Sequence, residues 1–329
     1  MDRVLCFVVF AAVSAGVAQA QYKAPRAIDG HPDLQGFWAN NNATPLERPK
    51  ELANHPVLSN AEVAAMRAKA REMFGSGKSD AAFGDNIFLA VWQNIHGERK
   101  GFKSVDGETG DYSSVWNDER DWDNRTSLIT DPPDGRIPPL TPRAEALRAA
   151  AREASQRPAR GPEDRSFSER CLSYGSPQLT EGYQSYYQIV QSPSAVMIMT
   201  EMIHDARSIP IDGPAHLLPS VGEWMGDSRG HWDGETLVID TTNYRPRAFM
   251  GVSSEKLHVT ERITRADAET LKYEITISDP DAWTKPWSLM VPLRRSSKPV
   301  YEYACHEGNE GLRGILAGAR ADEAKIAAK

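Results

Sequence analysis

A succession of short runs rich in β-branched and aromatic residues, from about residue 182 to 305, constrains the fold most. The runs are YYQIVQS, AVMIMTEMIHDARSIPI, SRGHW, ETLVIDTTNY, KLHVTERITR, TLKYEITIS, WSLMVPLRR and VYEYAC. Asp233-Gly234 between two of them is a strong hairpin signal, and ADAE at 266–269 is a second turn. Such short connections favour antiparallel pairing. We therefore predict a mainly β fold, an antiparallel meander that closes or nearly closes as a barrel over 166–312.

The first half of the chain is different, and we predict that 21–165 forms an N-terminal strand, helices and aromatic loops covering one mouth of the barrel. The clearest helix spans 58–75, where Ser59 and Glu62 form a capping box. A polar, aromatic stretch at 76–123 is interpreted as an ordered loop region. A strand, a tight turn and a second helix are predicted over 125–154, and a helix or tail over 313–329.

The first twenty residues have the pattern of a secretory signal peptide. Arg3 precedes an apolar run, and Ala18-Gln19-Ala20 forms a small-x-small cleavage signal, so we expect cleavage before Gln21. The mature chain is then periplasmic or secreted and has no membrane span. Its net charge stays at −7, because Asp2 and Arg3 cancel, which argues against nucleic acid as a partner. The sequence leaves the oligomeric state open.

Cysteine usage agrees with export to an oxidising compartment. Cys6 is removed with the signal peptide, which leaves Cys171 and Cys305. We predict that these two form a disulfide, which in the chain-entropy model stabilises a loop of this length by about 4–5 kcal/mol.

Strand alternation separates the ionisable residues into two sets. If 201–211 is one strand, Glu201, Asp205 and Arg207 share a face, and Glu261 lies with the apolar face of its own strand. Two outcomes follow for this set. Either Arg207 neutralises Asp205 or Glu261 in a closed ionic network, or one carboxylate keeps a raised pKa in a cavity as a general acid or base.

The second set lies on the opposite faces and contains His204, Asp240, His258, Arg262 and Glu274. Two histidines and two carboxylates could bind a divalent metal, but their spacing matches no metal motif, so we predict no metal site. A third candidate, YACHEGNEG at 303–311, follows the second cysteine of the predicted disulfide, and solvated polar neighbours are the commoner explanation for it. The sequence has no GxSxG elbow, phosphate-binding glycine loop, HExxH or dinucleotide fingerprint, so we expect no cofactor.

Several segments together resemble a broad family of secreted bacterial proteins that are mostly described as hypothetical. They are DLQGFW, RTSLITDPPDGRIPPLT, EMIHDARSIPIDG, GDSRGHWDGETLVIDTTNY, DPDAWTKPW and YEYACHEGN, and they span most of the mature chain. The resemblance implies export and a β-rich fold, and it implies no activity. Separately, Gly36-x-Trp38 is similar to the first-strand signature of lipocalins, which implies a lipocalin- or calycin-like barrel by fold analogy only.

These observations lead to one functional hypothesis with an alternative. We expect a cofactor-independent lyase, hydratase or hydrolase that acts on a carbohydrate-like or aromatic small molecule. The expected catalytic residues are His204, Asp205, Arg207, Glu261 and His258, and the expected substrate-binding residues are Glu201, Asp240, Tyr273 and Trp38. The alternative is a non-catalytic, lipocalin-type protein that binds a small ligand. A weaker third possibility is a purely structural envelope protein.

Overall fold

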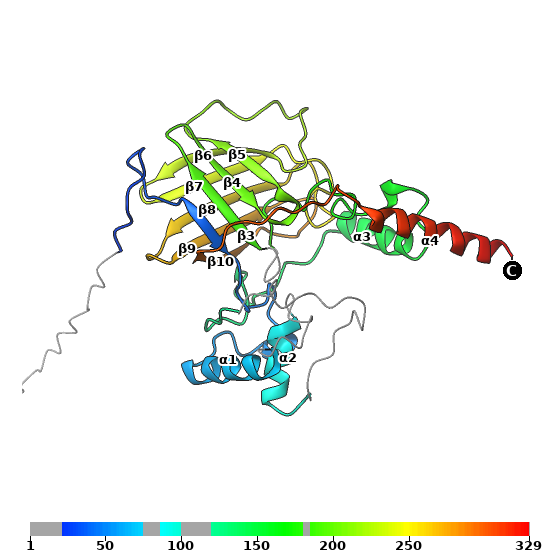
Figure 1. The fold of residues 1–329 in the computed structure, drawn as a ribbon, viewed down its shortest axis with the longest axis horizontal. Helices are drawn as coiled ribbons and strands as arrows, with labels where there is room; N and C mark the ends of the chain where they lie inside the picture. Colours follow the sequence, from blue (N-terminus) through cyan, green and yellow to red (C-terminus); the bar gives the residue numbers. More distant parts are fainter. Residues whose placement is uncertain (1–21, 75–85, 100–119, 180–184, 329) are drawn as a thin grey trace, which may run out of the picture.

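The computed structural model describes residues 22–74, 86–99, 120–179 and 185–328 (Figure 1). The predicted signal peptide and much of the aromatic stretch at 76–123 lie outside these residues.

One antiparallel sheet of ten strands dominates the described part of the chain (Figure 1). The strands are β1 (Gly36–Ala39), β2 (Ile129–Asp131), β3 (Tyr186–Gln191), β4 (Ala195–Thr200), β5 (Ala206–Pro210), β6 (Asp227–Asp233), β7 (Thr236–Thr242), β8 (His258–Arg265), β9 (Thr270–Ser278) and β10 (Trp287–Ser296). Their order is β5-β4-β3-β1-β10-β9-β8-β7-β6, and β2 pairs with β10. The prediction of a mainly β, antiparallel fold is confirmed.

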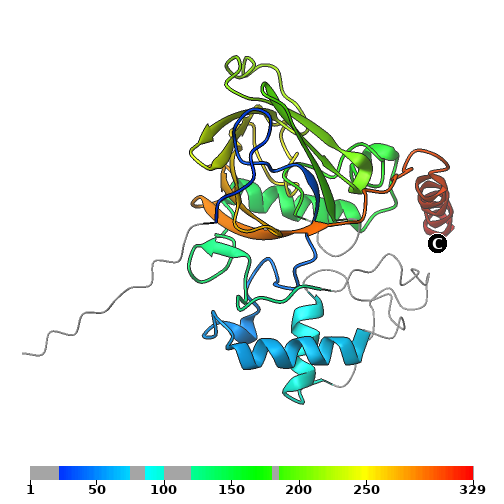
Figure 2. The same cartoon turned by 60° about the vertical axis from the view of Figure 1, so that its left-hand side comes forward.

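The sheet curves around its core but is not closed by a full ladder (Figure 2). Between its end strands, β5 and β6, the described contacts are an isolated bridge of Ile211, the residue after β5, with Gly230, and a 3.4 Å hydrogen bond from the Arg207 guanidinium to the Ser228 hydroxyl. The backbone N–H of Asp212 donates to the carbonyl of Gly230 at 2.9 Å. A Cβ atom on Gly230 would lie 2.6 Å from Cδ1 of Ile211, so glycine permits this close approach.

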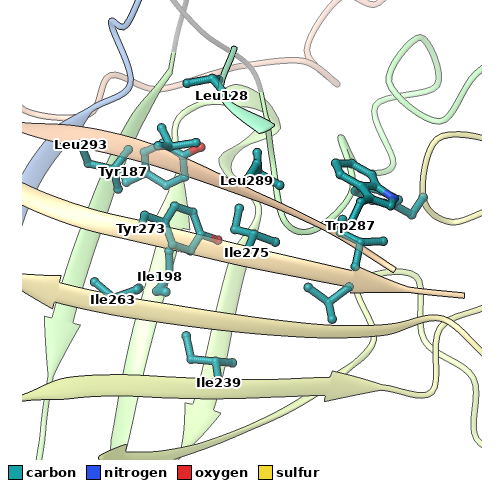
Figure 3. Close-up of a cluster of buried hydrophobic side chains, with 14 of the residues drawn as sticks. Leu128, Tyr187, Ile198, Ile239, Ile263, Tyr273, Ile275, Trp287, Leu289 and Leu293 are labelled. Atoms are coloured by element: carbon teal, nitrogen blue, oxygen red, sulfur yellow. The ribbon is translucent and has the colours of Figure 1, made fainter. Parts of the chain in front are cut away.

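Alternation correctly identifies the inner face of the long strands. In β8, Val259, Glu261 and Ile263 are buried, whereas the residues between them are partly exposed. The same two-residue period holds in β9 and β10, as expected for strands with one face on a core. Figure 3 shows residues of this inner cluster, including Tyr187, Ile198, Ile263, Tyr273 and Leu293.

The prediction of one strand through 201–211 is wrong. The chain ends β4 at Thr200, makes a 3-10 turn over Met202–His204, and returns as β5. Ile203 and His204 have φ values of +58° and +46°, which reverse the chain direction. Ile198 consequently pairs with Arg207, and the alternation count cannot be carried across the turn. The predicted strand VYEYAC is also irregular in the structure.

Helices lie outside the sheet (Figure 1). They are α1 (Asn60–Phe74), α2 (Asn86–Ile95), α3 (Pro142–Ser155) and α4 (Glu310–Ala327). The capping box of α1 is present, and the Thr141 side chain caps α3 by accepting from the Ala144 N–H. The helix α2 forms within the stretch interpreted as loop, and it packs with α1 on a small separate core. In the described residues, none of the helices has the length and apolarity to cross a membrane.

The predicted disulfide is present. Cys171 and Cys305 are bonded across 134 positions of sequence, and the bond ties the segment before β3 to the segment before α4.

Candidate functional site

A buried ion pair crosses the interior of the sheet. The guanidinium of Arg207 donates to both oxygens of Glu261, with N–O distances of 2.7 Å. The exposed fractions of the two side chains are 9% and 0%. Because β5 and β8 lie in opposite halves of the strand order, this pair joins the two arms of the curved sheet. We call it the central ion pair.

Tyrosines surround the central ion pair. The Tyr273 hydroxyl donates to Glu261, and the Tyr187 hydroxyl donates to the carbonyl of Gln178 at 2.9 Å. Figure 3 shows the two rings close together within the apolar cluster. Burial, reinforced by the charge of Glu261, raises the pKa of both phenols above the usual tyrosine range. For Arg207, burial opposes the charged form, but the Glu261 carboxylate outweighs burial and raises the pKa further.

A small cavity of about 20 Å³ lies beside this pair on the inner face of the sheet. It is lined by Gly175, Ser176, Gln178, Tyr187, Ile189, Ile198, Thr200, Asp205, Arg207, Met225, Ile263, Tyr273 and Leu293. A volume of roughly 10–15 Å³ is enough for one water molecule, whereas a drug-sized ligand needs roughly 300–1,000 Å³. The cavity therefore matches a water molecule or the tip of a larger ligand.

Asp205 is the carboxylate that borders the cavity, and it lies in the turn after β4. Its Oδ2 accepts from the Ser173 hydroxyl at 3.0 Å and from the Tyr174 backbone N–H at 2.9 Å. A longer contact of 3.5 Å joins the same oxygen to the Gln178 amide. Burial raises the pKa of Asp205, and these hydrogen bonds offset the effect only in part. Within the described residues, Asp205 has no salt-bridge partner at Lys, Arg or His.

Three other residues predicted for the site, Glu201, His204 and Trp38, do not line the cavity. Glu201 is buried in the turn, and it does not line the cavity. The ring of His204 is exposed, and its Nδ1 lies 2.9 Å from the carbonyl of Tyr303. Trp38 is fully buried, with the guanidiniums of Arg265 and Arg295 each 5.7 Å from its ring centroid. Trp38 could therefore contact a substrate, as predicted, only if the residues packed around its ring moved apart.

Apart from His204, which lies in the turn before β5, the second predicted set lies on the outer face of the sheet, away from the cavity. Asp240 pairs with His258 through Oδ2, and its Oδ1 lies 2.9 Å from Nε2 of His216. Nδ1 of His216 is 3.1 Å from Asp227, which also pairs with Arg229. Burial acts to raise the pKa of Asp227, but hydrogen bonds from Leu217 and Arg229 outweigh it, and the pKa is lowered.

The other two residues of this set on the outer face have separate surface partners. Arg262 pairs with Asp233, and Glu274 pairs with Lys272. Among the described residues, no group of three or more His, Cys, Asp and Glu side chains could hold a metal ion.

Sequence reasoning missed several residues of both sites. His216 lies in the loop between β5 and β6, and Ser173, Tyr174 and Gln178 lie in the irregular segment before β3. Neither segment has a strand or helix period, so no pattern indicated which residues they contact. The disulfide at Cys171 was the one available signal, because it fixes the segment that holds Asp205.

Comparison with known proteins gives no match to a family model, a curated protein or a solved structure. The geometry of the sites is therefore the basis for a functional proposal.

Proposed function

We propose that the protein is a periplasmic or secreted, cofactor-independent hydrolase, hydratase or lyase in which Asp205 is the general acid or base. Its substrate would be a carbohydrate-like or aromatic small molecule. The observation that carries the proposal is the position of Asp205, a half-buried carboxyl with a raised pKa on the wall of a cavity. A carboxyl group with a raised pKa keeps its proton to a higher pH than an ordinary aspartate and can deliver that proton to a substrate.

The hydrogen bonds to Asp205 favour one oxygen as the reactive one. The hydrogen bonds from Ser173, Tyr174 and Gln178 all reach Oδ2, and these donors orient the carboxyl group. Oδ1 is then the atom that would carry the exchangeable proton. A cavity that fits one water molecule beside this group favours hydrolysis or hydration, since both reactions consume water.

The other predicted catalytic residues receive different roles. Glu261 has both oxygens bound by Arg207, and Tyr273 also donates to it, so we assign it to positioning Arg207. Arg207 lines the cavity and would contact substrate from there. His204 is next to Asp205 but is oriented by Tyr303, and we retain it only as a candidate proton donor at the rim. His258 lies on the outer face and has no role in this proposal.

The alternative of a lipocalin-type binding protein is less well supported. A nearly closed barrel of the lipocalin or calycin type is our interpretation of the curved sheet and of the bridge between Ile211 and Gly230. The small interior volume supports the enzyme over the binding protein. A lipocalin-type interior holds its ligand, whereas here the central ion pair and tyrosines fill that space.

The test is a turnover screen of the mature chain against glycosides, sugar acids and phenolic compounds. We expect turnover of at least one class, loss of turnover in Asp205→Asn, and an unchanged thermal midpoint for that variant. Asp267→Asn, at an exposed turn, is the matched control. Full activity of Asp205→Asn, or no turnover across the panel, would contradict the proposal.

The pH dependence adds a second readout. If Asp205 acts as an acid, activity falls as the pH rises through its raised pKa, because the protonated form is lost. The Asp205→Asn variant should show no such limb in any residual activity.

A further inference from the structure

Two arginines and two aromatic rings form a cluster beside the cavity, which we call the Arg–aromatic cluster. The rings of Phe167 and Trp224 are 4.4 Å apart between centroids. The guanidinium of Arg245 lies 5.1 Å from the Trp224 ring, and that of Arg170 lies 5.9 Å from the Phe167 ring. Cation–π contacts of this kind hold both guanidiniums against the aromatic surface.

The Arg–aromatic cluster belongs to the rim of the cavity. Met225, the residue after Trp224, lines the cavity. The segment that follows Arg170 supplies Gly175 and Ser176 to the same wall, and Tyr174 donates to Asp205. The backbone after Arg245 also reaches this wall, since a Cβ atom on Gly175 would be 3.6 Å from the carbonyl of Ala248.

The aromatic part of this rim is accessible to a ligand. Trp224 is 39% exposed and Tyr174 is 43% exposed. A flat, partly exposed ring next to a cavity with both apolar and polar lining residues can stack against a sugar ring or an aromatic ring.

The charged part of the rim consists of Arg170 and Arg245. In the described part of the chain, neither Arg170 nor Arg245 takes part in a salt bridge. Nε of Arg245 donates to the carbonyl of Gly222 at 3.0 Å, which leaves its two terminal nitrogens for other acceptors. Glu223, next to Trp224, is exposed and is not within salt-bridge distance of either arginine. Two guanidiniums that are held on adjacent rings and have no salt-bridge partner among the described residues are suited to an anion in a chain of net charge −7, and the fork geometry of each fits a carboxylate.

We infer that the substrate is a ring compound that bears a carboxylate. Its ring would stack on Trp224, its carboxylate would bind Arg245 and Arg170, and its reacting atom would lie next to Asp205. Two sources offer this chemistry, a uronic acid of a saccharide and an aromatic carboxylic acid. The inference rests on the proposed function for the role of Asp205, but the binding it predicts can be measured without turnover.

The experiment compares acids with neutral compounds of the same ring. Galacturonate is paired with galactose, and 4-hydroxybenzoate with 4-hydroxybenzyl alcohol, in calorimetric titrations of the mature chain. The variants are Arg245→Gln, Arg170→Gln and Trp224→Ala. Arg313→Gln, on the exposed part of α4, is the matched control for loss of one positive charge. Circular dichroism and the thermal midpoint show that each variant is folded.

We expect the acid of at least one pair to bind about tenfold more tightly than its neutral partner, as one charge-assisted hydrogen bond predicts. Arg245→Gln and Arg170→Gln should reduce this preference and leave the neutral compound unaffected, and Trp224→Ala should weaken both. The pair that shows the preference identifies the saccharide or the aromatic source. Equal affinity for acid and neutral compound in both pairs, no binding of either acid, or an equal loss in Arg313→Gln would overturn the inference.

The outcome for Asp205 separates this inference from the proposed function. Asp205→Asn should keep the preference for the acid in the titration, whatever its effect on turnover. An intact acid preference together with full activity of Asp205→Asn would reject the proposed function alone.

Discussion

The central ion pair gives the sharpest prediction about stability. Glu261→Gln removes one charge and leaves the Arg207 guanidinium buried without a counter-ion. Breaking a buried pair in this way costs about 3–5 kcal/mol, because the remaining charge has lost both water and partner. Glu274→Gln on the outer face of β9 is the matched control. It breaks a half-exposed pair with Lys272 and should cost about 0–1 kcal/mol.

The double variant Arg207→Met and Glu261→Gln separates charge from packing. It removes the charge on both sides, and the glutamine oxygen still accepts from the Tyr273 hydroxyl. Arg207→Met alone should also cost about 3–5 kcal/mol, since it leaves a buried carboxylate. The double variant should cost less than the sum of the single variants by about 2 kcal/mol or more, within the range that such cycles measure for residues in contact.

Urea unfolding followed by tryptophan fluorescence, with the disulfide intact, provides the four free energies. If the single effects simply add, or if Glu261→Gln costs no more than Glu274→Gln, the pair does not have the energetic role that its burial indicates.

Three further predictions concern the scaffold. In thermal melts, Gly226→Ala should destabilise the fold by about 2 kcal/mol more than Gly234→Ala. Both glycines have positive φ, but of the two only Gly226 has other atoms within 4 Å of the position that a Cβ atom would take, the closest at 2.6 Å. Replacing both cysteines of the disulfide with serine should lower the free energy of unfolding by about 4–5 kcal/mol in urea; a loss under about 1 kcal/mol would contradict the loop-entropy argument. Stability should decline in alkaline melts above about pH 10, because the buried tyrosines described above keep their protons in the folded state while the unfolded chain releases them; a flat profile to pH 11 would contradict their raised pKa.

The sequence was sufficient for the position of Glu261 and insufficient for that of Asp205. Glu261 lies within a long strand whose neighbours alternate without interruption, so the two-residue period places it on the inner face. Asp205 follows two residues with positive φ, and the types of these two residues do not predict that conformation. Both residues were expected near Arg207, but the reason given for Asp205 assumed a strand that the chain does not form.

The outer-face contacts show the same limit. Asp240 and His258 belong to neighbouring strands in register, and alternation was enough to group them. His216 reaches them from a loop, where no period relates sequence to direction, and His204 was grouped with them only because the turn before β5 was not foreseen. Long-range contacts made by irregular segments depend on the whole fold and cannot be derived from local spacing.

The central ion pair also bears on the chemistry proposed for Asp205. Arg207 and Asp205 line the same cavity, and an unpaired guanidinium there would lower the pKa of the carboxyl group. Glu261 binds both terminal nitrogens of Arg207, so its negative charge offsets that of the arginine. Burial is the largest influence on the pKa of Asp205. Glu261→Gln should therefore lower the pKa of Asp205 and move the alkaline limb of the activity profile to lower pH, whereas Glu274→Gln should leave it in place. Profiles recorded on the folded fraction of each variant test this, and an unmoved limb in Glu261→Gln would show that Asp205 is not the titrating acid or that Arg207 does not influence it.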